Sequence, residues 1–178
     1  MKTLLFLAIS VFATALCAGQ DKQYVCTPCG QDCDNTIHHK PGSCPACGMA
    51  LVEKTTVKFK NLTFEEVCER LKANPKAVLL DVRTSEEFEG TSKKHSFGHF
   101  RNAININVEE LSQRLNEIEK YKDEEVIVYC SHSHRSPRAS QMLTSNGFKN
   151  VENVRGGVSA IRQSEKDCLS TNFVSHKD

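Results

Sequence analysis

The chain has 178 residues, of which 39% are hydrophobic, and its formal net charge is +1. This length suffices for one ordinary domain with a small appendage. A charge so close to zero gives no electrostatic argument for a nucleic-acid partner or an anionic membrane surface. Partners must therefore be inferred from local motifs.

Residues 1–19 have the pattern of a secretory signal peptide. One lysine precedes an apolar run that is too short to span a bilayer comfortably, and small residues close the segment. Leu16 stands beside Cys17, where lipoprotein signals carry a small residue, so we expect cleavage near Ala18 or Gly19. The sequence has no later apolar run long enough for a membrane span. We expect an exported protein, periplasmic or secreted.

Residues 20–52 contain two C-x-x-C-G turns, which start at Cys26 and Cys44 and leave fourteen residues between the two C-x-x-C units. Each turn can place two thiolates on one ion. We therefore predict a four-thiolate site that holds structural zinc or another soft metal ion, with the ligands Cys26, Cys29, Cys44 and Cys47. So short a stretch has few large apolar residues, and the metal would supply its stability. Disulfide pairing within the module is the alternative.

Four more soft or borderline donors lie in or next to this pattern: Cys33, His38, His39 and Met49. Their spacing does not bring them together as ligands of a second metal ion. We expect the methionine to pack and the histidines to be solvated. We interpret Cys33 as a spare thiol or as a replacement for one of the four ligands.

Residues 57–163 follow a short polar connector and alternate between strand and helix patterns. Thr63 and Glu66 form a capping box that starts a helix, and Cys68 falls on the apolar face of this helix. The expected strands are 78–82, 103–106, 126–129 and 151–154, and the further helices are 108–118 and 137–145. This alternation predicts an α/β fold, a parallel sheet with helices on both faces and active groups at the carboxyl ends of its strands.

Cys130 lies at such a strand end, directly before a polar loop and a helix. Loop N–H groups and the positive end of the helix dipole favour a thiolate there. We expect Ser136 to cap the helix and Pro137 to take its first position. Six residues from Cys130 to Arg135 enclose the sulfur, and the loop between them is Ser131, His132, Ser133 and His134.

The order of the motifs in 57–163 resembles that of a single-domain rhodanese. These motifs are residues 79–83, 86–88 and 98–105, the Cys130 loop, and Gly156 with Gly157. The resemblance implies a sulfurtransferase that passes sulfane sulfur from a small donor through a Cys130 persulfide to a thiol or cyanide acceptor. Ser131, His132, Ser133 and His134 would line the substrate site, and Arg135 would close the loop, either balancing an anionic donor or pinning the cradle. Related cysteine phosphatases have a loop one residue longer, so phosphatase activity is disfavoured.

The loop departs from the rhodanese pattern at one position. Ser133 stands where a glycine is usual, with a histidine on each side. We interpret His132 and His134 as solvated groups at the mouth of the site. The alternatives are that one of them assists proton transfer, or that both join Cys130 in trapping a soft metal ion.

Residues 24–51 resemble the heavy-metal-binding domain that is appended to some bacterial copper-transporting ATPases, in which a histidine often replaces Cys29. This resemblance implies metal ions as partners. The five clustered cysteines and the histidine-rich loop motivate an alternative function: an exported heavy-metal (zinc or copper) binding or redox-interaction protein that uses the rhodanese-like domain for recognition.

Two further expectations concern charged and cysteine residues outside the loop. Asp81 and Arg83 follow the strand 78–82 and are interpreted as scaffold, with Arg83 paired to Glu86 or Glu87. Residues 164–178 form a polar tail, in which we expect Cys168 to be a free thiol.

Overall fold

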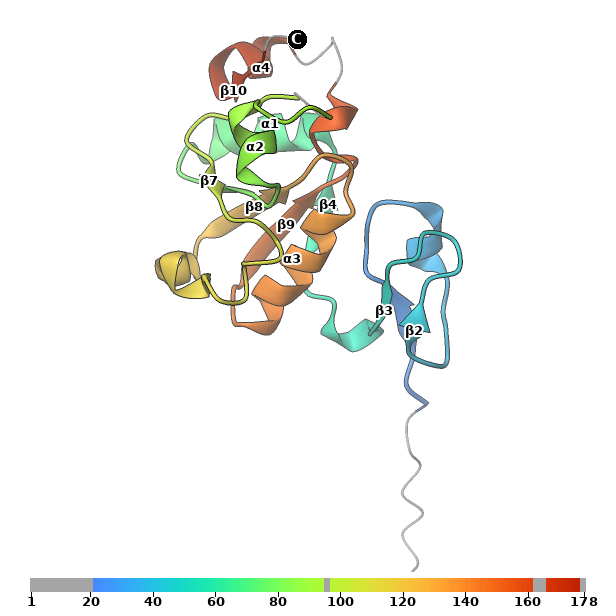
Figure 1. Cartoon of the computed structure of the whole chain (residues 1–178). Coiled ribbons are helices and arrows are strands. Elements are labelled where there is room, and N and C mark those ends of the chain that lie inside the picture. Colours follow the sequence, from blue (N-terminus) through green and yellow to red (C-terminus); the bar gives the residue numbers. More distant parts are fainter. Residues whose placement is uncertain (1–20, 95–96, 162–165, 177–178) are drawn as a thin grey trace, which may run out of the picture.

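The computed structural model describes residues 21–94, 97–161 and 166–176, so the predicted signal segment 1–19 lies outside the described residues. A sheet domain forms the larger part, and a small module lies beside it near α3 (Arg135–Ser145) and β4 (Lys60–Leu62) (Figure 1). Within the described ranges, no helix combines the length and the apolar character that crossing a membrane requires.

The sheet of the larger domain has five strands in the order β4-β9-β8-β5-β7, and every neighbouring pair is parallel. The strands other than β4 are β9 (Asn150–Val154), β8 (Glu125–Tyr129), β5 (Val78–Asp81) and β7 (Ile104–Asn105). This arrangement confirms the predicted α/β fold. β8 and β5 lie in the interior of the sheet, so their carboxyl ends meet at the middle of one sheet edge.

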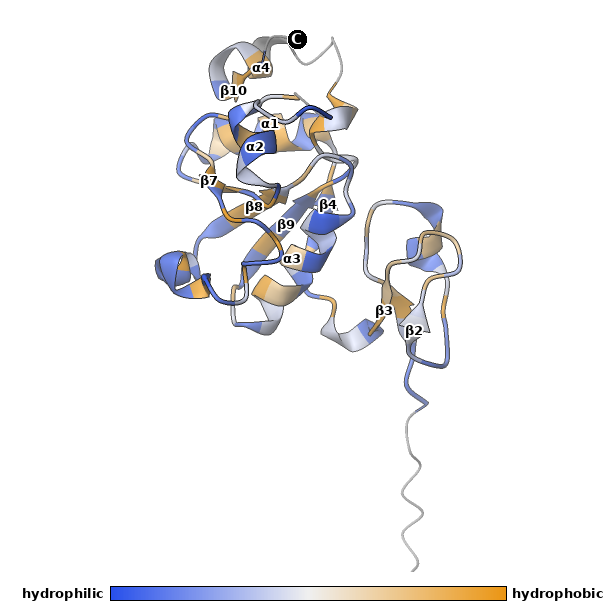
Figure 2. Ribbon diagram, viewed as in Figure 1, coloured by the Kyte–Doolittle hydropathy of each residue, from blue (hydrophilic) through white to orange (hydrophobic). Residues whose placement is uncertain are grey.

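Side chains of β8 alternate between the two cores that cover the sheet. Val126 and Val128 pack with α3, whereas Ile127 and Tyr129 pack with α1 (Phe64–Ala73). A parallel sheet buried on both faces requires apolar residues at successive strand positions, and the sequence of β8 provides them. Figure 2 shows hydrophobic colour along β8, which lies among helices whose outer faces are hydrophilic.

Two short helices begin with capping boxes. The predicted box at Thr63 and Glu66 caps α1, and a second box at Thr84 and Glu87 caps α2 (Ser85–Glu89). In each box the threonine accepts a hydrogen bond from the backbone of the glutamate, whose carboxylate accepts one from the threonine N–H. The second box holds a carboxylate near the sheet edge at which Cys130 lies.

The helix predicted over 108–118 is wrong. The segment consists of turns and the 3₁₀ helix η3 (Leu115–Glu117), and a second 3₁₀ helix, η4 (Glu119–Tyr121), follows it. Its backbone bonds mainly reach three residues back, as from Glu110 to Asn107. Val108 and Leu111 are nevertheless buried. A 3₁₀ turn places residues i and i+3 on one side, so the apolar spacing did not distinguish it from an α-helix.

The tail is packed against the domain through α4 (Lys166–Asn172) and β10 (Phe173–Val174). β10 pairs antiparallel with β6 (His99–Phe100). Cys168 is buried and forms a disulfide with Cys68 of α1, so the predicted free thiol is wrong. The two cysteines are 100 residues apart, and only the packing of α4 near α1 brings them together.

The small module is a three-stranded antiparallel sheet in the order β1-β3-β2, with the 3₁₀ helix η1 (Asp32–Asn35) between β1 and β2. Its strands are β1 (Tyr24–Cys26), β2 (Gly42–Ser43) and β3 (Ala50–Glu53), and η2 (Lys54–Thr56) leads to the larger domain. The module's core cluster comprises three buried cysteines and Met49, which packs as expected.

Candidate active site and cysteine cluster

Cys130 follows β8 directly and is almost completely buried, with 1% of its surface exposed. Its carbonyl accepts a hydrogen bond from Val158 N–H at 2.9 Å, and the carbonyl of Ser131 accepts one from Ser159 N–H at 3.0 Å. Gly157 makes this approach possible, because its φ is +63° and a Cβ would lie 2.3 Å from the Cys130 oxygen. The turn after β9 therefore fixes the start of the cysteine loop.

Ser136 does not cap the helix. α3 begins at Arg135 with His134 as the N-cap residue, so Pro137 lies third in the helix, where its missing N–H would be unbonded anyway. Ser136 is fully buried, and its hydroxyl donates to Cys130 Sγ at 3.3 Å. A hydroxyl donor stabilises a thiolate more than a thiol. Because α3 begins at Arg135, two residues earlier than predicted, Ser136 lies within the helix and contacts the sulfur of Cys130, the candidate nucleophile.

Arg135 closes the loop through Glu87 of α2. Its Nη2 atom lies 2.7 Å from Glu87 Oε1 and 3.2 Å from the hydroxyl of Ser131, which itself donates to Glu87 at 2.9 Å. Burial raises the pKa of Glu87, but the hydrogen bonds from Arg135, Ser131 and the Thr84 N–H outweigh it and lower this pKa to about 2. The guanidinium is thus held in a frame that binds both ends of the loop to α2.

Arg83 pairs with Asp81 rather than with Glu86 or Glu87. Both side chains are completely buried, and Arg83 Nη2 lies 2.6 Å from Asp81 Oδ2 and 2.7 Å from the carbonyl of Gly98. Because the chain turns directly after β5, the two side chains can meet although the residues are only two positions apart in the sequence. The arginine connects the end of β5 to the start of β6, and Glu87 is left for Arg135.

Ser133 occupies the position where the sequence departs from the rhodanese pattern. It adopts φ +56°, a left-handed conformation that favours glycine, and it is 2% exposed. Its hydroxyl donates to the carbonyl of Cys29 at 2.9 Å and accepts from Asn153 Nδ2 at 3.1 Å. The loop of the larger domain is therefore bonded directly to the small module.

The two loop histidines have exposed side chains. His134 Nδ1 lies 3.0 Å from the carbonyl of His132, and the ring of His132 meets Phe97 edge-on at 5.5 Å. The bond to the carbonyl requires a hydrogen on Nδ1 of His134.

Four cysteine sulfurs of the small module lie within 4.8 Å of one another: Cys26, Cys29, Cys33 and Cys47. The sulfurs of Cys26 and Cys47 are 3.3 Å apart, and those of Cys33 and Cys47 are 3.8 Å apart. Sulfurs bound to one tetrahedral zinc ion at about 2.3 Å lie about 3.8 Å from each other. The donor set therefore fits a soft metal ion.

This group adds a cysteine to the predicted ligands. It contains Cys33 of η1 and does not include Cys44. Cys44 is buried in the same core cluster, and its thiol interacts with those of Cys26 and Cys47, so its predicted role as a ligand stays a prediction. Burial raises its pKa, but backbone N–H groups of Cys47 and Ala46 and the neighbouring thiols outweigh this and lower it to about 7. His38 and His39 do not belong to the group.

Asp34 supports the turn that follows Cys29. Its carboxylate accepts hydrogen bonds from the backbone N–H groups of Cys29 at 3.1 Å and Gly30 at 2.7 Å. Gly30 has φ +89°, and a Cβ there would lie 2.4 Å from Cγ of Arg155 in the larger domain. The same turn therefore carries a cluster sulfur and contacts the end of β9.

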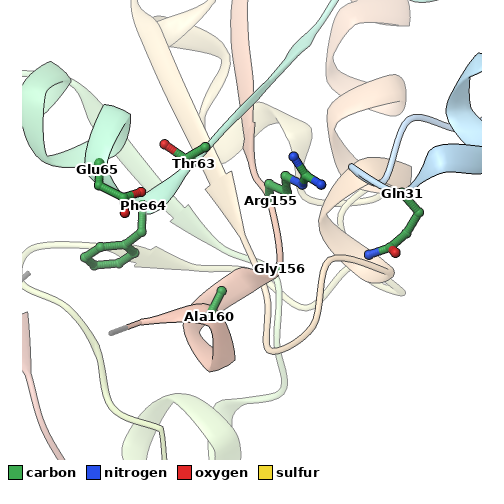
Figure 3. A pocket seen from close by; sticks show the side chains of 7 residues that line it. All are labelled: Gln31, Thr63, Phe64, Glu65, Arg155, Gly156 and Ala160. Atoms are coloured by element: carbon green, nitrogen blue, oxygen red, sulfur yellow. The ribbon is translucent and has the colours of Figure 1, made fainter. Parts of the chain in front are cut away.

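Two cavities lie between the module and the larger domain. One, of ≈430 Å³, is lined by Cys33 and Cys47 on the module side and by His132 and His134 on the loop side. The other, of ≈420 Å³, lies between Gln31 and the end of β9; Figure 3 shows Arg155 and Gln31 on the side nearer the module.

The sequence interpretation missed three contributors to this site: Ser136, Glu87 and Asn153. Ser136 was assigned to the helix cap, and Glu87 was considered only as a partner of Arg83. Asn153 lies in β9, where it is fully buried and bonds both Ser133 and Asn61. An amide side chain within a predicted strand was the available signal.

Comparison with known proteins gives two family matches. The model described as rhodanese-like domain matches residues 63–164, and the model described as heavy metal binding domain matches residues 23–54. The uncharacterized protein YqhL of Bacillus subtilis is 45% identical over 82 residues, which cover 46% of this chain and 58% of YqhL. The tRNA uridine(34) hydroxylase of Hamiltonella defensa is 32% identical over 118 residues, covering 64% of this chain and 31% of the hydroxylase.

A solved structure is also similar. The crystal structure of reduced Bacillus anthracis CoADR-RHD has a TM-score of 0.50 and 27% sequence identity, covering 65% of this chain and 18% of that chain. The chain thus spans less than two thirds of the length of each of these relatives. By the extent of the larger match, this protein belongs to the rhodanese-like domain family, and it carries a heavy metal binding domain ahead of the rhodanese-like domain.

Proposed function

We propose that the protein is an exported sulfurtransferase in which Cys130 carries sulfane sulfur as a persulfide. The Cys130 thiolate attacks the outer sulfur of a small donor such as thiosulfate. The sulfur–sulfur bond of the donor breaks, sulfite leaves with the bonding electrons, and Cys130 becomes a persulfide. A thiolate or cyanide acceptor then attacks the outer sulfur of this persulfide, and the Cys130 thiolate leaves and is regenerated.

The observation that carries the proposal is the placement of Cys130. It lies between the end of an interior strand and the start of α3, and the Ser136 hydroxyl lies 3.3 Å from its sulfur. The amino end of an eleven-residue helix and a hydroxyl donor both favour an anionic sulfur. Cys130 is also the free cysteine of the described larger domain, since Cys68 and Cys168 are joined.

Arg135 has a positioning role in this proposal. Both terminal nitrogens of its guanidinium are bonded to Glu87, so the cation is already paired before a donor arrives. Such a bidentate pair is geometrically rigid. Arg135 therefore maintains the six-residue cradle around the sulfur, and Ser131 is held by the same carboxylate.

The name of the hydroxylase relatives does not determine the reaction proposed for this chain. It describes proteins of which this chain spans about a third. Sulfur transfer rests instead on the nucleophile, on its short loop and on membership of the rhodanese-like family. The acceptor proposed here is a thiol or cyanide.

Zinc in a structural role is the proposed metal of the small module. Four clustered sulfurs fit a tetrahedral ion, and the module's core offers few apolar side chains besides Met49. Cys26, Cys29, Cys33 and Cys47 would hold the ion, which would stabilise the fold of the module. The same donors suit cuprous ion.

The disulfide between Cys68 and Cys168 supports export. Disulfides persist in oxidising compartments and are rare in reducing cytosol. The signal segment expected at residues 1–19 gives the same location, periplasmic or secreted.

A second candidate function follows from the cysteine cluster. A heavy-metal-binding or redox-interaction protein would use the module for metal ions and the rhodanese-like domain for recognition. In that case Cys130 would form no persulfide with any donor, and its replacement would weaken metal binding.

The test is a donor screen on the full chain with mass detection at Cys130. Thiosulfate, polysulfide and glutathione persulfide are supplied in turn, and a gain of one sulfur atom on Cys130 followed by transfer to a thiol is expected. A Cys130→Ala protein as active as the parent would exclude the proposed mechanism. Titration of the parent and of Cys130→Ala with zinc and cuprous ion tests the second candidate function. Metal binding that weakens in the variant, with no persulfide formed by any donor, would favour it.

A further inference from the structure

The Cys130 loop and the small module are joined through the side chain of one loop residue, Ser133. Its hydroxyl donates to the backbone carbonyl of Cys29, whose side chain supplies one of the four clustered sulfurs. A cluster sulfur and the loop of the candidate nucleophile are thus connected through one residue on each side. This contact is buried, since Ser133 is 2% exposed and Cys29 is 2% exposed.

Ser133 has an unfavourable backbone conformation, and its hydrogen bonds compensate for this. A serine at φ +56° is in a region that side chains disfavour, where a glycine would be accommodated without strain. The hydroxyl compensates by bonding Cys29 and Asn153, which is completely buried and anchored to Asn61. Without the Cys29 carbonyl, Ser133 would retain the unfavourable backbone conformation and lose a buried hydrogen-bond partner.

The position of the Cys29 carbonyl depends on the turn that the metal would organise. Asp34 holds the N–H groups of Cys29 and Gly30, and Gly30 packs against Arg155. A metal ion bound by Cys29 would fix this turn from the sulfur side. Without the ion, four neighbouring thiols and few apolar side chains would have to hold it.

We propose that Ser133 is a positioning residue through which the metal-loaded cysteine module holds the Cys130 loop in its reactive conformation. The inference rests on the proposed sulfurtransferase function. It makes the rate of sulfur transfer depend on metal in a site that does not touch the reacting sulfur. It also explains why a serine stands at a position with φ +56°.

The experiment compares zinc-loaded full chain with protein stripped by a chelator under anaerobic conditions without reductant, so that the disulfide stays intact. Two rates are measured: alkylation of Cys130 by iodoacetamide, resolved by mass spectrometry, and persulfide formation from thiosulfate or polysulfide. Both should fall about tenfold on stripping, the size expected for losing one buried hydrogen bond. Equal rates in the two metal states would overturn the inference and leave sulfur transfer standing.

Ser133→Gly tests the route of the coupling. Glycine adopts the left-handed conformation without the hydroxyl, so both rates should become the same with and without zinc while zinc content is unchanged. Gln141→Ala is the matched control, because it removes the hydrogen bonds between α3 and Thr56 and leaves Ser133 with Cys29. It should retain the metal dependence, and retention of that dependence in Ser133→Gly would exclude Ser133 as the route.

Gly30→Ala separates docking from metal binding. It keeps all the cluster sulfurs, but its Cβ would collide with Arg155 and strain a left-handed turn. We expect zinc-loaded Gly30→Ala to react at the rate of the stripped parent. Reaction at the rate of the loaded parent would contradict the inference. If no donor forms a persulfide while alkylation still depends on zinc, the proposed function fails and the coupling remains.

Discussion

The two parts of this protein use cysteine in opposite ways. The module gathers five cysteines around a core that otherwise contains little more than Met49. The larger domain has two apolar clusters that cover both faces of its sheet, and its cysteines are a disulfide pair and one buried thiol. We therefore propose that stability depends on a soft metal ion in the first part and on apolar burial in the second. This difference leaves the larger domain with a thiol free for chemistry.

Removing the thiol of Cys130 should have the largest effect. Cys130→Ala is expected to abolish sulfur transfer from every donor, because no other described thiol lies at that strand end. Zinc content and the free energy of unfolding should stay close to the parent values. Donor assays with mass detection, combined with metal analysis, check this, and loss of zinc in the variant would instead favour the metal-trapping alternative for Cys130.

The next effect separates the metal ligands from their neighbour. Cys33→Ser should lose most of the bound zinc and expose the amides of the module to hydrogen exchange, because Cys33 belongs to the group of four sulfurs. Cys44→Ser, the matched variant, should retain more zinc. The larger domain should keep its protection in both. Equal zinc loss in the two variants would show that Cys44 is a ligand as well.

Breaking the disulfide should destabilise only the larger domain. Cys168→Ser is expected to lower its free energy of unfolding by about 3–5 kcal/mol, because the bridge closes a long loop in the unfolded chain. Urea unfolding measures this loss. Cys68→Ser and the double variant should lose the same amount, and additive losses would show that each cysteine contributes mainly through packing.

Glu87→Gln should weaken the frame of the Cys130 loop. Arg135 would keep a neutral partner in place of a carboxylate, at a cost of about 2 kcal/mol for a charged hydrogen-bonded pair that is partly exposed. Urea unfolding at pH 7 gives the stability and thiosulfate kinetics the activity. Glu86→Gln on the same helix is the control and should change neither by much.

The smallest predicted effect is the loss of stability that follows when Glu87 is protonated at acid pH. Its pKa in the folded protein, about 2, lies below the ordinary value of 4.5, so its stabilising contribution is complete above pH 4.5 and is lost as the pH falls from 4.5 towards 2. Urea unfolding between pH 6 and pH 3 should therefore show an acid loss that Glu87→Gln reduces. An unchanged slope in the variant would assign the acid loss to other carboxylates.

The sequence alone determined the α/β class, most of the strands, the first capping box and the position of Cys130. These features depend on neighbours in the chain: β-branched runs of strand length, a threonine three residues before a glutamate, and a cysteine between a strand and a helix. Local patterns fix local structure because the interactions involved span only a few residues.

Tertiary structure alone decided which residues become partners. The disulfide joins residues 100 positions apart, Glu87 reaches Arg135 across 48 positions, and Ser133 reaches Cys29 across 104. Cys33 joins the clustered sulfurs because η1 turns it towards them. Such pairings depend on how whole elements pack, and residue spacing carries no information about distances of that kind.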